Sequence, residues 1–492
     1  MEIRERGKID RLLEILHELR KSRTGFTGLA IILFFIILGA LAPVITYNDP
    51  IKDLNLAADF AMPEWITILP WYRDLPRNTE IVFKPEEWII QIHTQRYFNI
   101  EHRTGNNYID IETTRTAEEI REQELEIYSL TQTFKYQYQP PSFFILYVKM
   151  NISIASIGDS YKVLIELNTP TGKTYKIHDT GYIPYQYKQS TWINPQIISS
   201  DFPNLKEMNN ISLKENAAKI ILSEKGEYRL EIKVLFKPAP GINQPGSGIN
   251  LSIAEITLKI PGSVYGIMGT NYVGADVWSQ FVWGIRQSFL VGILASSVAV
   301  ALGVVFGMII GYAGRYTREA LLLLVDTIYL IPLLPILLIA LIIVGRNIYA
   351  VAVIIGLFTW AGLARELGNW ILSLRENQYV EVAKALGGSE LYVMLKHVLP
   401  FTFHLVLFAF IIRIPFSILL EAGLSIIGFG DPFQASWGKM LNEALAGGAL
   451  ISAAWWWITP PIIGLTTLSL GFVFLGFALD EIMNPKLKQE ER

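Results

Sequence analysis

One stretch of this chain ends as a phosphate-binding loop does, which would imply ATP chemistry. A Gly-Lys-Thr sequence begins at Gly172, but such a loop also needs a glycine five positions earlier, where the chain has Leu167. The residues from Tyr175 to His178 alternate as a strand does, so those from Thr169 to Gly172 are predicted to form a hairpin turn. We therefore expect no ATPase site in this chain.

Other catalytic and metal-binding patterns are missing from the sequence as well. The chain has no cysteine for disulfides or thiolate ligands, and no Gly-x-Ser-x-Gly sequence for a nucleophilic serine. The histidines form no i, i+4 pair and no arrangement with carboxylates at metal-ligand spacing; they are His17, His93, His102, His178, His397 and His404. The sequence predicts no catalytic site, no metal site and no bound cofactor.

Three ionisable residues within long apolar segments are better candidates for function: Asp326, Arg413 and Glu421. Ionisable groups at membrane depth are costly and usually face a cavity or a partner. Arg413, near the middle of its segment, either lines a pathway, where it would meet a carboxylate of a passing solute, or forms a buried ion pair. Asp326 is the nearest partner in depth, and the ion pair is the favoured alternative.

The composition is that of a membrane protein that carries a large polar part. The chain has 492 residues, of which 51% are hydrophobic, with a mean hydropathy of +0.33 and a net charge of −3. These values favour neither a soluble enzyme nor a nucleic-acid-binding protein.

The first membrane span is expected at residues 25–46, after a basic, amphipathic segment at residues 1–24. By the positive-inside rule that segment is cytoplasmic. A cleaved signal peptide is the alternative, but the basic leader is long and no small-residue cleavage site follows, so an uncleaved anchor is favoured. The next span begins only near Gln287, which leaves residues 47–262 outside the cell, followed by an interfacial segment at residues 263–286.

Five further spans are expected within residues 287–480, which gives six in total. Starting inside, this topology makes the tail at residues 481–492 cytoplasmic, and the basic residues gather on the cytoplasmic side as the rule requires. The expected spans are Gln287 to Tyr312, Glu319 to Val344, Ile348 to Gly368, Phe401 to Gly423, and Ala453 to Ala478.

A charged segment at residues 376–400 lies between two of these spans and is too polar to cross a bilayer. A first helix is predicted to stop at Gly387, where the backbone can turn freely. A second short helix is predicted from Ser389, a good N-cap, to Pro400, which blocks continuation. Both helices should lie on the membrane surface, where they could dock a cytoplasmic partner.

This segment carries a family resemblance. Glu381 and Ala383, then Gly387, then Leu399 and Pro400 match an E-A-A, Gly, apolar-x-L-P signature, with Val382 in place of its first Ala. The chain in this respect resembles the permeases of ABC importers, in which this loop inserts into a groove of the ATPase subunit. The alternative is an ordinary interfacial hairpin. The residues that the resemblance implies for ATPase coupling are Glu381, Ala383, Lys384, Gly387, Leu399 and Pro400.

Other positions resemble the second permease subunit of dipeptide and oligopeptide importers. The resemblance covers the first span and everything after about residue 266, and it leaves out the polar insert. Asp326 and Glu421 belong to this pattern, which implies roles in helix packing or at the subunit interface. The matching landmarks are Gly269, Thr270, Gly274, Asp276, Arg286, Asp326, Glu421 and Gly423.

The resemblance implies a fold and a set of partners. The expected fold is an α-helical polytopic membrane protein, type I ABC importer-like with six spans, with an inserted, mainly-β extracellular domain. The implied partners are a homologous permease, two ATPase subunits that bind ATP and Mg, an extracellular substrate-binding protein and membrane lipid, without nucleic acid. No cofactor is expected in this chain, which would be a transport subunit of the cell membrane and not an enzyme.

The insert is predicted to hold an antiparallel β-sandwich in its second half. In its first half, Glu118 to Ile127 could be a helix, and Trp65 to Trp71 could lie at the membrane surface. The insert would dock the binding protein, cap the pathway or brace the complex, with a cap as the working hypothesis. The predicted strands are Phe143 to Ile154, Tyr161 to Leu167, Lys173 to Ile177, Ala218 to Leu222, Glu227 to Phe236 and Ile249 to Ile260.

The leading functional hypothesis is therefore a permease subunit of an ATP-driven importer for dipeptides or oligopeptides. An oligosaccharide importer of the same family is the second hypothesis. A membrane receptor is less favoured because only about a dozen residues follow the last span. A self-powered secondary transporter is disfavoured because the six spans show no matching internal repeat.

Overall fold

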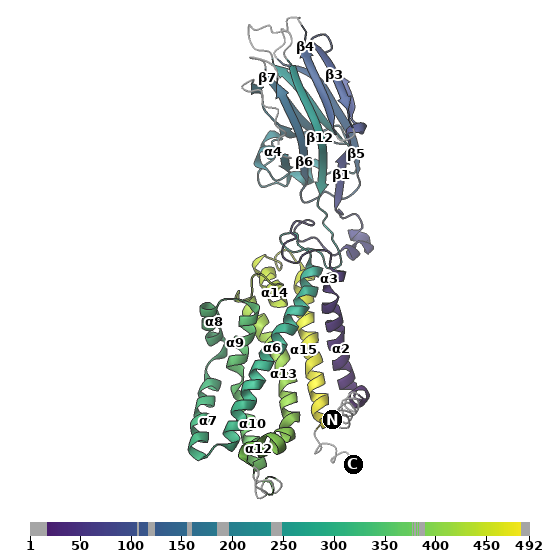
Figure 1. Ribbon diagram of the computed structural model, residues 1–492. Coiled ribbons are helices and arrows are strands. Elements are labelled where there is room, and N and C mark those ends of the chain that lie inside the picture. The colour runs from purple at the N-terminus through teal and green to yellow at the C-terminus, as the bar shows by residue number, and fades with distance from the viewer. Residues whose placement is uncertain are drawn as a thin grey trace. The chain divides into compact units, whose positions relative to one another are not determined.

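The computed structural model describes residues 17–105, 108–116, 124–154, 160–184, 196–237, 248–375, 377, 380, 382 and 389–483. The chain divides into two compact units (Figure 1). The helical unit contains the residues up to Leu54 and from Ala275 onward, and the β unit runs from Asn55 to Gly274.

Five helices of the helical unit are long and apolar enough to cross a membrane, counted over the described residues. Apolar side chains dominate each of them, as expected of helices whose outer surface contacts lipid. One of the five is built from two helices, α9 and α10, that run on through Trp360, whose backbone stays helical. The candidates are α2 (Arg23–Ala40), α6 (Val277–Tyr312), α9 with α10 (Ile348–Thr359 and Ala361–Arg375), α13 (Leu399–Ile426) and α15 (Trp455–Met483).

The stretch predicted as one span from Glu319 to Val344 is instead a bent pair of helices. α7 (Arg315–Leu330) and α8 (Leu333–Val344) meet at an angle of 85°. The bend follows from Pro332, because the residue before a proline is pushed out of the α conformation, and Ile331 has the extended backbone expected there (φ −64°, ψ 129°). Counting this pair as one broken span gives the six spans that the sequence predicted.

The second long helix begins earlier than the predicted start of its span near Gln287. α6 starts at Val277, because Asp276 caps it: the carboxylate accepts hydrogen bonds from the backbone amides of Trp278 and Ser279, each at 3.2 Å. Residues 277–286, expected in an interfacial segment, are therefore the first turns of this 36-residue helix.

Glycines on α6 let α10 approach closely. A Cβ atom added at Gly303 would lie 2.8 Å from Leu363, and one added at Gly307 would lie 3.0 Å from Leu367. Gly311 faces Ile371 at still closer range. Small residues four apart on one face are the usual means by which membrane helices pack backbone against backbone. α10 is thereby fixed against the longest helix of the unit.

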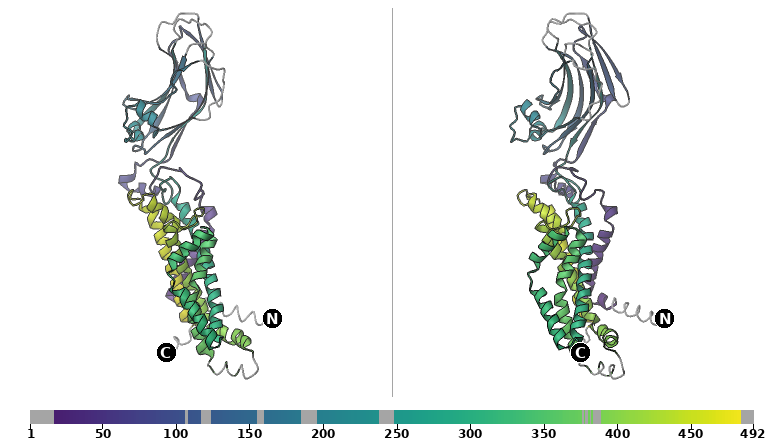
Figure 2. Two further views of the ribbon diagram at one scale, coloured as in Figure 1. Left: turned by 90° about the vertical axis from the view of Figure 1, so that its left-hand side faces the viewer. Right: turned by 60° about the vertical axis from the view of Figure 1, so that its left-hand side comes forward.

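The β unit is a sandwich of two six-stranded antiparallel sheets, which face each other in Figure 2. One sheet has the order β10-β6-β12-β4-β3, with β1 also paired to β12, and the other has the order β2-β5-β11-β7-β8, with β9 paired to β7. The strands are β1 (Thr79–Phe83), β2 (Ile89–Ile92), β3 (Phe98–Thr104), β4 (Ile109–Arg115), β5 (Leu125–Tyr136), β6 (Ile145–Ile154), β7 (Ser160–Asn168), β8 (Thr174–Asp179), β9 (Ile183–Pro184), β10 (Gln196–Ser199), β11 (Gly226–Lys237) and β12 (Gly248–Ile260).

Apolar side chains from both sheets meet between them and form the core. Phe236 of β11 is fully buried and contacts the rings of Phe98 and Tyr161, at centroid distances of 5.0 and 5.2 Å. Phe134 stacks on Tyr228 at 5.6 Å. Alternation along each strand places these side chains inward, because successive residues of a strand point to opposite faces.

Most of the strand predictions for the insert are confirmed, at β6, β7, β8, β11 and β12. The predicted hairpin turn is also confirmed: the amide of Gly172, at φ +89°, donates to the carbonyl of Thr169 at 2.9 Å. The sandwich is larger than predicted, because strands from the first half of the insert, β1 to β5, join both sheets.

Two predictions for the insert are wrong. The stretch from Ala218 to Leu222 lies in a short helix, α5 (Ala217–Ile221), because the side chain of Asn216 caps it by accepting from the Lys219 amide at 3.1 Å. Instead of the helix proposed for Glu118 to Ile127, strand β5 begins at Leu125, where pairing with β11 outweighs local helix propensity, and residues 118–123 lie outside the described residues.

The stretch from Trp65 to Trp71, predicted to lie at the membrane surface, forms two short 3₁₀ turns, η1 (Glu64–Ile68) and η2 (Pro70–Tyr72). Its membrane position stays a prediction.

Candidate functional site

The described part of the predicted coupling segment is a short helix that runs directly into a membrane helix. α12 (Glu390–Val393) is followed by a π-helical turn, η4 (Met394–Val398), and then by α13. The hydroxyl of Ser389 accepts from the Tyr392 amide at 3.3 Å, as predicted for an N-cap. Among the predicted coupling residues, Glu381, Ala383, Lys384 and Gly387 lie outside the described residues.

The predicted end of this helix at Pro400 is wrong. Leu399 and Pro400 open α13, and the chain passes into it without a break. A proline in the first turn of a helix removes no intrahelical hydrogen bond, because the amides there have no partner in any case. The segment at residues 389–398 and α13 therefore form one continuous element.

One face of this segment packs on the end of α10. Val393 and Val398 are buried in a cluster with Leu367, Ile371 and Leu374 of α10. The opposite face, with Leu395 and Lys396, is exposed. The segment is thus packed against α10 and continuous with α13.

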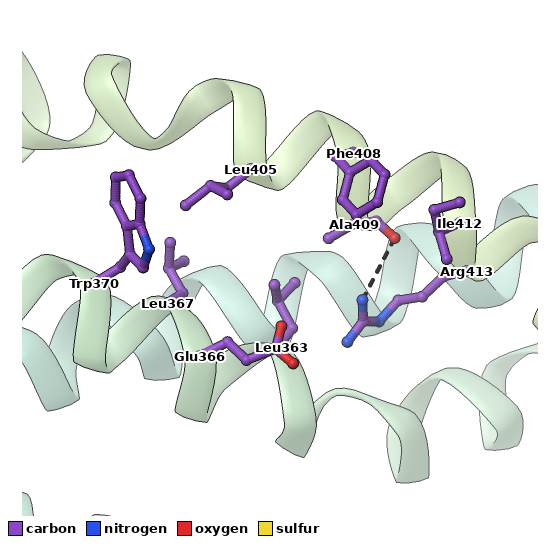
Figure 3. Close-up of a pocket in the computed structure, with 9 residues that line it drawn as sticks. All are labelled: Leu363, Glu366, Leu367, Trp370, Leu405, Phe408, Ala409, Ile412 and Arg413. Atoms are coloured by element: carbon purple, nitrogen blue, oxygen red, sulfur yellow. Dashed lines mark hydrogen bonds between the residues drawn. The ribbon is translucent and has the colours of Figure 1, made fainter. Parts of the chain in front are cut away.

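A cavity of about 450 Å³ lies between α10 and α13 (Figure 3). Its walls are mostly apolar, but two charged side chains, Glu366 and Arg413, extend into it. Arg413 is half-buried and donates to the carbonyl of Ala409, on its own helix, at 3.4 Å. The full lining is Leu363, Glu366, Leu367, Trp370, Leu405, Phe408, Ala409, Ile412 and Arg413.

The favoured partner of Arg413 in the sequence analysis, Asp326, has another partner. Asp326 on α7 forms an ion pair with Arg365 on α10, at 3.0 Å. Arg365 and Glu366 are neighbours in the chain, so one ion pair joins α7 to α10 while the next carboxylate enters the cavity. The prediction of an Arg413–Asp326 pair is therefore wrong.

Sequence reasoning missed Glu366 and Arg365. Both lie within the predicted span from Ile348 to Gly368. The rule that singled out Asp326 and Arg413, an ionisable group within an apolar segment, applies to them equally.

Glu421 is buried and hydrogen-bonded within the protein. Its side chain is 2% exposed and accepts hydrogen bonds from the hydroxyls of Ser425, at 2.6 Å, and Ser436, at 3.2 Å. Ser436 also caps α14 (Trp437–Ala446) by accepting from the Lys439 amide at 3.1 Å. Glu421 thus ties α13 to the start of α14. At the nearby landmark Gly423, an added Cβ would meet no atom within 4 Å.

The landmarks that precede α6 set backbone turns. Gly269 and Gly274 have positive φ angles of 70° and 67°, which favour glycine. The hydroxyl of Thr270 donates to the carbonyl of Ala58 at 2.6 Å and accepts from the Ala61 amide at 2.8 Å. The bonds of Thr270 hold the two ends of the β unit's chain together.

Asp276 and Arg286 belong to the helical unit. Asp276 caps α6, and Arg286 lies over the ring of Trp283, 4.9 Å from its centre. None of the five landmarks around the start of α6 touches the cavity between α10 and α13.

Comparison with known proteins assigns the helical part of the chain to a family. Residues 303–489 match the model of the binding-protein-dependent transport system inner membrane component. An inward-facing structure of a methionine ABC transporter also matches, with 17% identity and a TM-score of 0.34, over 41% of this chain and 94% of that one.

Several curated relatives are peptide permeases by name. A dipeptide transport system permease protein of Bacillus subtilis is 28% identical over 50% of this chain and 76% of its own length. A putative peptide permease protein of Brucella suis is 31% identical, over 44% of this chain and 72% of its own. An oligopeptide transport system permease protein of Haemophilus influenzae is 30% identical, over 45% and 71%.

The family model and these relatives agree with the membrane helices in the fold. Members of this family are not catalytic; they are permeases that work with other components of an ABC transporter. The chain belongs to the binding-protein-dependent inner membrane components, and it is a multi-pass membrane permease subunit of an ABC importer that carries an additional, mainly-β region.

Proposed function

We propose that this permease carries dipeptides or oligopeptides. The observation that supports this is the identity of about 30% with peptide permeases over more than 70% of their length. In the proposed complex the chain pairs with a homologous permease, two ATPase subunits hydrolyse ATP, and a binding protein outside the cell delivers the peptide. Oligosaccharides are the competing cargo.

The coupling role of the segment at residues 376–400 is part of this proposal. The residues proposed to contact the ATPase are Glu381, Ala383, Lys384, Gly387, Leu399 and Pro400. In support, the described part is buried against α10 on one face, continuous with α13 at its end, and exposed on its other face. A displacement of the segment would therefore move both walls of the cavity, which is how a rigid lever changes access to a pathway.

The topology follows from the same proposal. Both chain ends and the coupling segment face the cytoplasm, and the β unit lies outside the cell membrane. We propose that the β unit caps the entrance of the pathway.

Transport by the reconstituted complex tests the cargo. The chain, its partner permease, the ATPases and the binding protein would be placed in liposomes, and uptake of labelled peptides and of labelled oligosaccharides would be compared. We expect ATP-dependent uptake of peptides. Uptake of oligosaccharides alone would overturn the proposal for peptides while leaving the permease assignment intact.

Site-specific cross-linking tests the coupling segment. Because the chain has no cysteine, Leu395→Cys introduces a single reactive thiol on the exposed face. We expect this thiol to cross-link to an ATPase subunit, whereas Leu213→Cys, an exposed position in the β unit, should not. Equal cross-linking at the two positions, or none at Leu395→Cys, would contradict the coupling role.

A clean deletion tests the β unit. Thr79 and Ile260 face each other in paired strands, so a short turn can join Asn78 to Pro261 and remove the sandwich without straining its ends. We expect uptake driven by the binding protein to fall while the helical unit keeps its thermal stability. Full uptake by the shortened chain would show that the sandwich neither caps the pathway nor docks the binding protein.

A further inference from the structure

The cavity between α10 and α13 contains one acidic and one basic group in otherwise apolar walls. Glu366 comes from α10 and Arg413 from α13, and the side chains of Leu363, Leu405 and Phe408 surround them. Its volume of about 450 Å³ falls within the range of small-molecule sites, about 300–1,000 Å³.

The two charged groups attract each other electrostatically, but no hydrogen bond joins them. Within the described residues, the hydrogen bond of Arg413 goes to the carbonyl of Ala409 on its own helix, and the Glu366 side chain is exposed. A guanidinium has five N–H donors, so most of the binding capacity of Arg413 is left for another acceptor. The neighbouring charges are already matched, because Arg365 pairs with Asp326 at 3.0 Å.

Two opposite charges that face a cavity with no hydrogen bond between them can each still bind a charged group of a solute. Ionisable groups within spans are usually found facing a partner or a water-filled pathway. In these walls Arg413 can bind an anionic group and Glu366, on the other helix, can bind a cationic group, with apolar surface between them. This is the complement of a small zwitterion with an apolar middle.

We propose that Glu366 and Arg413 form a subsite for the charged ends of a zwitterionic solute, with the ammonium group at Glu366 and the carboxylate at Arg413. This inference rests on the proposed peptide function and states that the chain recognises the charged ends of the peptide. Because the subsite recognises the two ends and not a particular side chain, it is compatible with peptides of varied sequence. Trp370 closes one end of the cavity and contributes apolar surface.

Uptake of end-blocked peptides by the whole reconstituted complex tests the subsite. The substrates are a peptide with free ends, the same peptide amidated at its carboxyl end, and the same peptide acetylated at its amino end. For Arg413→Gln we expect uptake of the free peptide at limiting concentration to fall about tenfold or more, because a charge-assisted hydrogen bond is lost. Uptake of the amidated peptide should change little. Glu366→Gln should show the mirror result, with the acetylated peptide little changed.

Arg365→Gln is the matched control, because it removes an arginine next to Glu366 on α10 whose partner is Asp326 and which does not line the cavity. We expect it to lower uptake of all three peptides by the same factor, through assembly or stability. If Arg413→Gln and Glu366→Gln behave as this control does, or leave uptake of every peptide unchanged, the subsite is overturned while peptide transport stands. If the unmodified complex carries none of the peptides, the proposed function fails, and the subsite fails with it.

Discussion

The two units of this chain differ in how completely each buries its apolar side chains and pairs its charged ones. The β unit closes its apolar side chains between two sheets and pairs charges at its surface, as Lys162 does with Asp179 at 2.9 Å. The helical unit leaves Ile342 and Ile343 more than two-thirds exposed, and its Glu366 and Arg413 face a cavity with no hydrogen bond between them. The sandwich of the β unit has its own buried core, although Ile68 and Trp71 outside the sandwich are exposed, whereas the exposed apolar side chains of the helical unit are those expected of a surface that contacts lipid and other subunits.

The largest effect on stability is expected from a substitution that creates a cavity in the sandwich core. Phe236→Ala removes a fully buried ring that contacts Phe98 and Tyr161, and it should lower the free energy of unfolding of the β unit by about 3–5 kcal/mol. Thermal unfolding of the detergent-solubilised chain, followed by proteolysis of each unit, measures this. If the comparison is right, the helical unit keeps its unfolding temperature.

The control for that variant lies on the same sandwich. Val82→Ala trims a side chain that is 45% exposed and should change stability by about 0.5 kcal/mol or less. Joint unfolding of both units in Phe236→Ala would show that the β unit is not independent.

A second variant tests helix packing inside the helical unit. Gly311→Ala places a methyl group against the side chain of Ile371 on α10 and should destabilise the chain by about 1–3 kcal/mol. Gly423→Ala, where an added Cβ meets no atom within 4 Å, should be neutral or slightly stabilising in the isolated chain. Thermal stability in detergent distinguishes the two, and equal melting temperatures would contradict close packing of α6 on α10.

A third variant tests the early start of α6. Asp276→Ala removes the carboxylate that caps the Trp278 and Ser279 amides and should cost about 0.5–2 kcal/mol. Asp276→Asn keeps an acceptor oxygen and should cost less. Hydrogen exchange at the first turns of α6 is the direct measurement. Unchanged protection in both variants would mean that tertiary packing alone sets this helix start.

The smallest effect is expected from a surface ion pair of the β unit. Burial acts to raise the pKa of Asp179, but the hydrogen bonds from Lys162 and from the Gly181 amide outweigh it, so this pKa lies below its ordinary value. The contribution of the pair is therefore present above about pH 4 and is lost as pH falls through the folded-state pKa. Because solvent screens the pair, the contribution should be about 1 kcal/mol or less.

Hydrogen exchange in β7 and β8 across this pH range measures the effect. Asp179→Asn should lower protection above pH 4 and remove its acid dependence. A wild-type profile that is flat below pH 4, with the same values in the variant, would contradict the pair's contribution.

Local signals in the sequence located most elements but failed where a stretch was compatible with two kinds of secondary structure. The stretch from Ala218 to Leu222 fits a strand pattern, yet its buried residues Ala217, Ala218 and Ile221 also fit a helix face. Asn216, a good N-cap, was the signal that could have decided it. Pro332 likewise indicated the bend between α7 and α8, which a count of apolar residues alone does not detect.

The sequence by itself determined five of the six candidate membrane spans, most strands and the resemblance to ABC permeases, because hydropathy, alternation and motif spacing act over a few neighbouring residues. Only the tertiary structure decided that Asp326 pairs with Arg365, that Glu366 and Arg413 share a cavity, and that the segment at residues 389–398 continues into α13. These outcomes depend on which helices become neighbours. The partner of a long side chain is set by that packing, and spacing along the chain does not encode it.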